Sequence, residues 1–242
     1  MAEEQSTLGL SMNSFMSNFI SKGYDFQVGV STTEAYLNGK EALKKVPVAP
    51  PNVALPTGSG QNGNLGCISD GGYGLIATPC SGNVAIVTPS TPNTVNTLVA
   101  NAVVGTNGNS TERGLMSTVT TLKAAANSGF LRADSFLAVV IISDVDDTDT
   151  NSVSCYLDNT GTCVAAGGST YTPAGGFNLD AITSSSGISR RYNISTIFYN
   201  GEALPCAGES QGTPSPRYAS LAGLTNGVGA SICNNFATSL DN

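Results

Sequence analysis

Three carboxylates follow directly on an apolar run of the chain, in the segment from Leu137 to Asp147. Residues 137–142 are all apolar, and Asp144 and Asp146 stand with Asp147 just after them. A continuous run of this kind, rich in β-branched residues, predicts a strand of a parallel sheet that is covered on both faces. Ligands of open α/β sheets bind just beyond the carboxyl ends of such strands. Asp144 is therefore placed to hold a metal ion or a polar ligand.

A simpler interpretation makes Asp144 a solvated turn residue after a strand. Asp146 and Asp147 are then surface carboxylates, or an outer shell that tunes a metal bound nearby. Together with Asp149 they have the composition of a calcium-binding loop. The EF-hand pattern requires Gly at its sixth position and Glu at its twelfth. Counted from Asp144, those positions hold Asp149 and Cys155, so the EF-hand pattern is excluded.

The six cysteines are a second group of residues that could do chemistry. A zinc site is disfavoured because no pair has CxxC spacing and the chain has no histidine. A catalytic thiol would also lack a histidine partner. Disulfides of an exported protein fit better. Spacing does not fix their connectivity, and pairing of sequence neighbours is our expectation: Cys67 with Cys80, Cys155 with Cys163, and Cys206 with Cys233.

Composition limits the classes of protein and partner. Of 242 residues, 40% are hydrophobic, which is enough for a sizeable core, and only 11% are charged. The net charge is −7, from 17 acidic and 10 basic residues. A nucleic-acid partner is excluded by the lack of a basic footprint, whereas cation binding is compatible with this charge. Low charge and paired cysteines favour a secreted, extracellular or cell-surface protein.

The amino-terminal residues conflict with export. Residues 1–22 carry Glu3 and Glu4 where a signal peptide has basic residues, and they lack an unbroken apolar core. No stretch of the sequence is long enough to span a membrane. Either the thiols stay reduced in a cytoplasm, or the natural gene product begins before Met1. We favour the second explanation.

Alternating patterns of helix and strand organise the chain. Residues 1–22 predict an amphipathic helix, because its apolar residues are spaced to share one face. Further helices are expected at 92–104, 111–127, 178–190 and 218–224, with a final helical turn at 234–240, and strands at 25–33, 84–87, 137–143, 194–199 and 229–233. Two long insertions are expected at about 46–83 and 148–176. The alternation predicts a single α/β domain over residues 1–242, with a doubly wound, mostly parallel sheet and helices on both faces.

Three stretches together carry a resemblance to a known family: residues 1–8 with Phe15, Phe19 and 25–33; residues 111–115 continuing to 132; and residues 137–147. Residues 217–222 and 231–233 match less closely. These stretches resemble the von Willebrand factor A domain family, in its bacterial, extracellular, disulfide-containing form. The resemblance implies a von Willebrand factor A or Rossmann-like fold and a binding function.

Members of this family commonly carry a metal-ion-dependent adhesion site with three parts. The resemblance implies Thr111 as its threonine and Asp144 as its aspartate, with Ser110, Asp146 and Asp147 as possible rim or outer-shell residues. The first part, Asp-x-Ser-x-Ser, is absent, and the resemblance would put it just before Met1 together with the first central strand. We therefore expect Mg²⁺, or Ca²⁺ or Mn²⁺, to bind this chain alone weakly or not at all. Thr111 could instead be a helix N-cap, in competition with Ser110.

The leading hypothesis is an extracellular binding or adhesion module that engages a protein or another surface ligand. The alternative is a structural subunit of a surface fibre or assembly. Its missing strand would come from an upstream segment or another chain, because an incomplete sheet exposes unpaired backbone groups. An enzyme is not expected. A metal-dependent hydrolase using Asp144, Asp146 and Asp147 would lack a histidine base, and no phosphate loop or nucleophile elbow is present.

Overall fold

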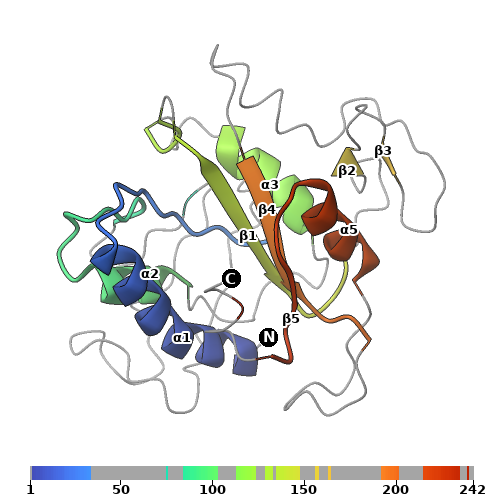
Figure 1. Cartoon of the computed structure of the whole chain (residues 1–242), viewed down its shortest axis with the longest axis horizontal. Helices are drawn as coiled ribbons and strands as arrows, with labels where there is room; N and C mark the ends of the chain where they lie inside the picture. Colours follow the sequence, from blue (N-terminus) through green and yellow to red (C-terminus); the bar gives the residue numbers. More distant parts are fainter. Residues whose placement is uncertain are drawn as a thin grey trace, which may run out of the picture.

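A computed structural model describes residues 2–33, 75, 84–102, 113–123, 129–132, 135–147, 156–157, 163–164, 192–201, 215–234 and 239. Its helices and strands are, in chain order, α1 (Ala2–Ser21), α2 (Thr94–Ala102), α3 (Gly114–Lys123), β1 (Leu137–Ser143), β2 (Tyr156–Leu157), β3 (Cys163–Val164), β4 (Tyr192–Phe198), α5 (Pro216–Leu224) and β5 (Gly229–Ser231) (Figure 1). The predicted helix at 178–190 and most of both predicted insertions lie outside the described residues.

The main sheet has three parallel strands in the order β1-β4-β5. Leu137 is paired with Tyr192 at one end of β1, and Ser143 with Phe198 at the other, so β1 and β4 match along their full lengths. The predicted parallel strands at 137–143 and 194–199 are thus confirmed, the second beginning two residues earlier. A separate antiparallel pair, β2 with β3, lies within the predicted insertion at 148–176.

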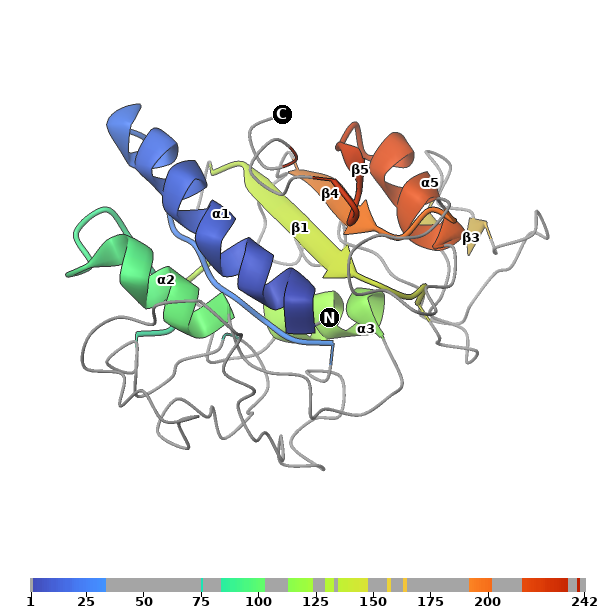
Figure 2. The ribbon, with the colours of Figure 1, turned by 90° about the horizontal axis from the view of Figure 1, so that it is seen from below.

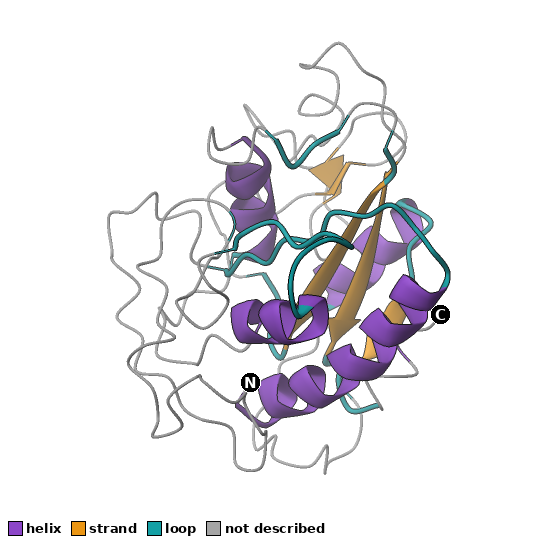
Figure 3. Ribbon diagram, turned by 90° about the vertical axis from the view of Figure 1, so that its left-hand side faces the viewer, coloured by secondary structure: helices purple, strands orange, loops and turns teal. Residues whose placement is uncertain are grey.

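Helices pack on both faces of this sheet. On one face Leu115 of α3 and Tyr218 of α5 form a buried cluster with Ile141 and Phe198 of the strands. On the other face Leu8 of α1 is buried with residues of α2, β4 and the segment after β5. The arrangement can be followed in Figure 2 and Figure 3. A small parallel sheet with helices on both faces confirms the predicted α/β class.

Helix α1 confirms the helix predicted at residues 1–22. Its apolar side is anchored by Met16, which has no exposed surface and packs with Phe26 and Leu98. Phe19 stacks on Phe15 with ring centroids 5.7 Å apart and lies 5.2 Å from the ring of Phe26. The periodic apolar residues therefore hold α1 against α2 and against the segment that follows α1.

The strands predicted at 25–33 and 84–87 are reduced to a single antiparallel bridge between Val28 and Val87. The two residues exchange both backbone hydrogen bonds, each with an N–O distance of 2.8 Å. The predicted alternation is present, because Phe26, Val28 and Val30 all face the cluster around Met16. Within the described residues no ladder extends from this bridge. The prediction of two regular strands was therefore too strong.

Strand β1 differs from its prediction on one face. Ile141 is buried against α3 and α5, and Leu137, on the same face, is also buried, as expected. On the opposite face Ala138 is exposed and Val140 keeps 47% of its surface exposed. Among the described residues, Ile142 is the position on this face that packs on the cluster containing Leu8 of α1. The prediction that β1 is covered on both faces is therefore wrong for this half of the strand.

Candidate functional site

The predicted site lies where β1 ends. The Ser143 hydroxyl donates to the carbonyl of Val145 over 2.7 Å, which closes a tight turn directly after the strand. Asp144 is half-buried in this turn, at the carboxyl edge of the parallel sheet. Its predicted partners Thr111 and Ser110 lie outside the described residues. Helix α3 begins at Gly114, three positions after Thr111 in the sequence.

Asp147 binds the amino-terminal end of α3. Its Oδ2 accepts a hydrogen bond from the backbone N–H of Leu115 over 3.0 Å, and its side chain has no exposed surface. The first N–H groups of a helix have no partner within the helix, and a carboxylate there also interacts favourably with the helix dipole. Asp147 is thus a remote N-cap of α3. Its interpretation as a surface carboxylate was wrong, because the helix start covers it.

Asp146 makes the corresponding contact with α5. Its Oδ1 accepts from the backbone N–H of Arg217 over 3.3 Å, and its Oδ2 lies 3.7 Å from Arg217 Nε. The residue before the helix, Ser215, makes no side-chain capping bond. Asp146, in the turn after β1, therefore supplies the acceptor that the local sequence of α5 does not. Its side chain is only 18% exposed, so it is not a surface carboxylate either.

Arg217 joins the two aspartates. Its Nη1 donates to the backbone carbonyl of Asp147 and lies 4.0 Å from that residue's Oδ1, while its Nε faces Asp146. Sequence reasoning gave this arginine no role of its own. Pro216 at the first helical position was a usable signal for the helix start. The contact itself spans about seventy residues of sequence, so local patterns did not indicate it.

Burial influences the electrostatics of the two aspartates and Arg217. Desolvation raises the pKa of Asp146 to about 6, and the nearby Arg217 guanidinium opposes the rise. Both oxygens of Asp146 face Arg217, and those of Asp147 face α3 and Arg217. These two carboxylates are thus directed to helix ends and to an arginine. A cation at this edge would rely on Asp144 and on residues outside the described part of the chain.

Metal-ligating residues are sparse in the part of the chain that the structure describes. No group of three or more His, Cys, Asp or Glu side chains lies close enough there to hold a metal ion. Carboxylate and hydroxyl oxygens are ligands that Mg²⁺ prefers, but Asp144 alone is not a sufficient set. Of the two predicted metal ligands, the described residues include only Asp144, so the adhesion site stays a prediction.

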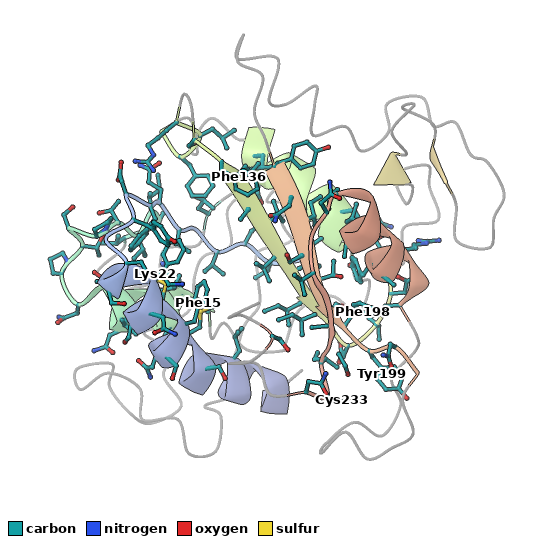
Figure 4. All side chains as sticks on the ribbon, in the orientation of Figure 1. Phe15, Lys22, Phe136, Phe198, Tyr199 and Cys233 are labelled. Atoms are coloured by element: carbon teal, nitrogen blue, oxygen red, sulfur yellow. The ribbon has the colours of Figure 1, made fainter. Side chains whose placement is uncertain are left out.

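The structure describes the side chain of one of the six cysteines predicted to form disulfides. Cys233, just after β5, is disulfide-bonded, and its N–H donates to Ser231 Oγ over 3.0 Å. In Figure 4 it lies near Tyr199 at the end of β4. Its expected partner Cys206 lies outside the described residues, as do Cys67, Cys80 and Cys155. Cys163 is opposite Leu157 in the β2–β3 register. The three pairings stay predictions.

Comparisons of the chain with models of known protein families, with curated proteins and with solved structures gave no match. The von Willebrand factor A resemblance therefore stays a prediction from the sequence. Among the described helices, none combines the length and the apolar character that crossing a membrane requires.

Proposed function

We propose that this chain is an extracellular binding module of the von Willebrand factor A type. It carries part of a metal-ion-dependent adhesion site and engages a protein or another surface ligand. The hydrogen bond between Leu115 N–H and Asp147 is the observation that carries the proposal. It ties the start of α3 to the turn that holds Asp144, and Thr111 precedes α3 by three residues. A carboxylate at the carboxyl edge of a parallel sheet is also well placed for a ligand.

In this proposal Asp144 and Thr111 would hold Mg²⁺, Ca²⁺ or Mn²⁺. The bound ion would supply an open coordination position for a carboxylate of the partner. Asp146 and Asp147 would act from the outer shell, by holding the two helix ends beside the metal ligands. Ser110 would lie on the rim of the site. We propose no catalytic role, because the chain has no histidine to serve as a general base.

Calorimetric titration with Mg²⁺ tests this function. Two proteins are compared: the present chain, and the same chain preceded by a strand that ends in Asp-x-Ser-x-Ser. We expect the extended protein to bind at least ~10-fold more tightly, because added hydroxyl and carboxylate ligands contribute free energy at ~1.4 kcal/mol per factor of ten. Asp144→Ala should abolish the gain.

The matched control is Asp25→Ala, which removes an exposed carboxylate far along the chain from the predicted ligands. It should leave the gain unchanged. Equal Mg²⁺ affinity of the present and extended chains would contradict the proposed function. So would an extended chain whose affinity does not depend on Asp144.

A further inference from the structure

Two Asn-Gly pairs in the part of the chain that the structure describes differ in their backbone surroundings. They are Asn200-Gly201, after β4, and Asn226-Gly227, between α5 and β5. We propose that Asn200 is a site of spontaneous deamidation, whereas the fold protects Asn226. This modification of the chain does not depend on the metal ligands of the proposed adhesion site. Further asparagines that precede glycine lie outside the described residues: Asn38, Asn62 and Asn107.

The reaction needs an available backbone nitrogen after the asparagine. That nitrogen attacks the side-chain carbonyl carbon Cγ, and its proton passes through solvent to the side-chain nitrogen, which leaves as ammonia. Water then opens the cyclic succinimide at either carbonyl, which gives aspartate or isoaspartate. The net change converts an amide and water into a carboxylate and an ammonium ion. Glycine in the second position favours the attack, because it has no Cβ to obstruct it and its backbone is permissive.

Exposure does not distinguish the two asparagines. Asn200 and Asn226 are both exposed, so water reaches both side chains. Each pair also contains one residue with a positive φ, which is 86° at Gly201 and 54° at Asn226. The difference between the pairs therefore lies in what holds the nitrogen of the glycine.

The backbone of Gly227 is fixed on two sides. Its N–H donates to the carbonyl of Ala222 in α5 over 2.9 Å, so the nitrogen that would attack Asn226 is held in a hydrogen bond. A Cβ added to Gly227 would collide with the carbonyl oxygen of Ile194 in β4. This backbone therefore packs directly against the strand and cannot turn toward the asparagine side chain without breaking its contacts.

The residues that flank this pair are also tied to β4. Thr225 Oγ1 accepts from the N–H of Ile194 over 3.0 Å, and the N–H of Val228 donates to Ser195 Oγ over 3.1 Å. A backbone held in this way reacts only in conformations that open locally, and such opening costs free energy. Deamidation of Asn226 in the folded protein should therefore be slow.

Gly201 is held less firmly. Its N–H makes no hydrogen bond with a residue that the structure describes, and the residue is exposed. Its φ of 86° is a conformation that residues with a Cβ rarely adopt. The nearest backbone contact before the pair is the hydrogen bond from Ser215 N–H to the carbonyl of Tyr199, at 2.9 Å. The nitrogen of Gly201 is therefore available for attack on Asn200.

The position of Asn200 gives the reaction a consequence for the sheet. Phe198 at the end of β4 pairs with Ser143 at the end of β1, so Asn200 leaves the sheet at the same carboxyl edge as the turn of Asp144. Figure 4 shows Phe198 and Tyr199 at this end of β4. Each conversion places a new carboxylate there and adds one negative charge to the net charge of −7. The charge of this edge therefore changes with the age of the molecule.

Incubation of the whole folded chain at mildly alkaline pH, followed by peptide mass spectrometry, tests this proposal. After reduction of the disulfides, trypsin cleaves after Arg191 and Arg217, so Asn200 lies in peptide 192–217 and Asn226 in peptide 218–242. Fragment spectra assign each mass increase to a residue, and isoaspartate identifies the succinimide route. We expect Asn200 to react at least ~10-fold faster than Asn226, because Asn226 must first open locally.

The same incubation in urea is the first control. Unfolding removes the contacts of Gly227, so both pairs should then react within about threefold of each other. Asn200→Gln should remove the early mass increase of peptide 192–217, whereas Asn193→Gln, in the same peptide, should leave it. Similar rates at Asn200 and Asn226 in the folded protein would overturn the proposal. So would a difference of about tenfold that persists in urea, because local sequence and not the fold would then select Asn200.

Discussion

The two faces of β1 differ although the strand is apolar from Leu137 to Ile142. On the side of α3 and α5, which we term the closed side, Leu137 and Ile141 are buried and the turn after the strand caps both helices. On the opposite face, which we term the open side, Val140 is nearly half exposed. An apolar run therefore predicts a strand correctly, but it does not show which face of that strand is covered by the rest of the chain.

The largest effect should come from truncating adjacent residues on the two sides. Ile141→Ala, on the closed side, should lower the free energy of unfolding by about 2–5 kcal/mol, because it leaves a cavity among buried side chains. Val140→Ala, on the open side, should cost less than about 1 kcal/mol. Urea unfolding of both variants measures the difference. Similar losses would contradict the distinction between the sides.

An intermediate effect is expected from pH at the caps of the closed side. The pKa of Asp146 rises from 3.8 to about 6, so the folded protein binds a proton more readily than the unfolded chain. The stabilisation linked to this proton is present below pH 3.8 and is lost as pH rises through about 6. Between pH 4 and 7, wild-type protein should therefore lose up to about 3 kcal/mol relative to Asp146→Asn.

Urea unfolding at several pH values checks this difference, and Asp25→Asn controls for the loss of one negative charge at an exposed position. If wild-type protein and Asp146→Asn keep a constant difference over this range, the assignment of the effect to Asp146 is wrong. If wild-type protein instead gains stability relative to Asp146→Asn as pH rises, the predicted sign of the effect is wrong.

The smallest effect is expected from the exposed ion pair between Arg132 and Asp25, ahead of β1 in the sequence. Arg132 and Asp25 are 2.7 Å apart, but their side chains are 34% and 84% exposed. A double-mutant cycle with Arg132→Ala and Asp25→Ala should give a coupling energy below about 1 kcal/mol. The coupling should fall further in high salt. A coupling above about 2 kcal/mol would contradict the treatment of this ion pair as a weak, exposed one.

Local patterns were sufficient for the regular elements. The apolar spacing of α1 and the uninterrupted run of β1 each depend on residues that are close in sequence, and both elements occur where predicted. Helix α3 begins at Gly114 rather than at residue 111, and α5 begins at Pro216 rather than at 218. The start of α3 could not be read locally, because its capping carboxylate comes from the turn after β1, whereas Pro216 was an available local signal for the start of α5.

The candidate site was predictable in part. The sequence located Asp144 at the end of a parallel strand, since strand type and strand end are local properties. It did not predict that Asp146 and Asp147 are occupied by helix ends, because Arg217 and Leu115 are distant along the chain. The exposure of one face of β1 was also not predictable, because an apolar sequence does not show which element covers each face of a strand.

The neighbouring caps Asp146 and Asp147 also bear on how the chain folds. They stabilise helices that begin at Gly114 and Pro216, so neither helix start is complete until the turn after β1 is in place. The two helices should therefore gain and lose their structure together, as one cooperative unit nucleated from the sheet. Because these contacts join distant parts of the sequence, their formation belongs to the slow, late steps of folding.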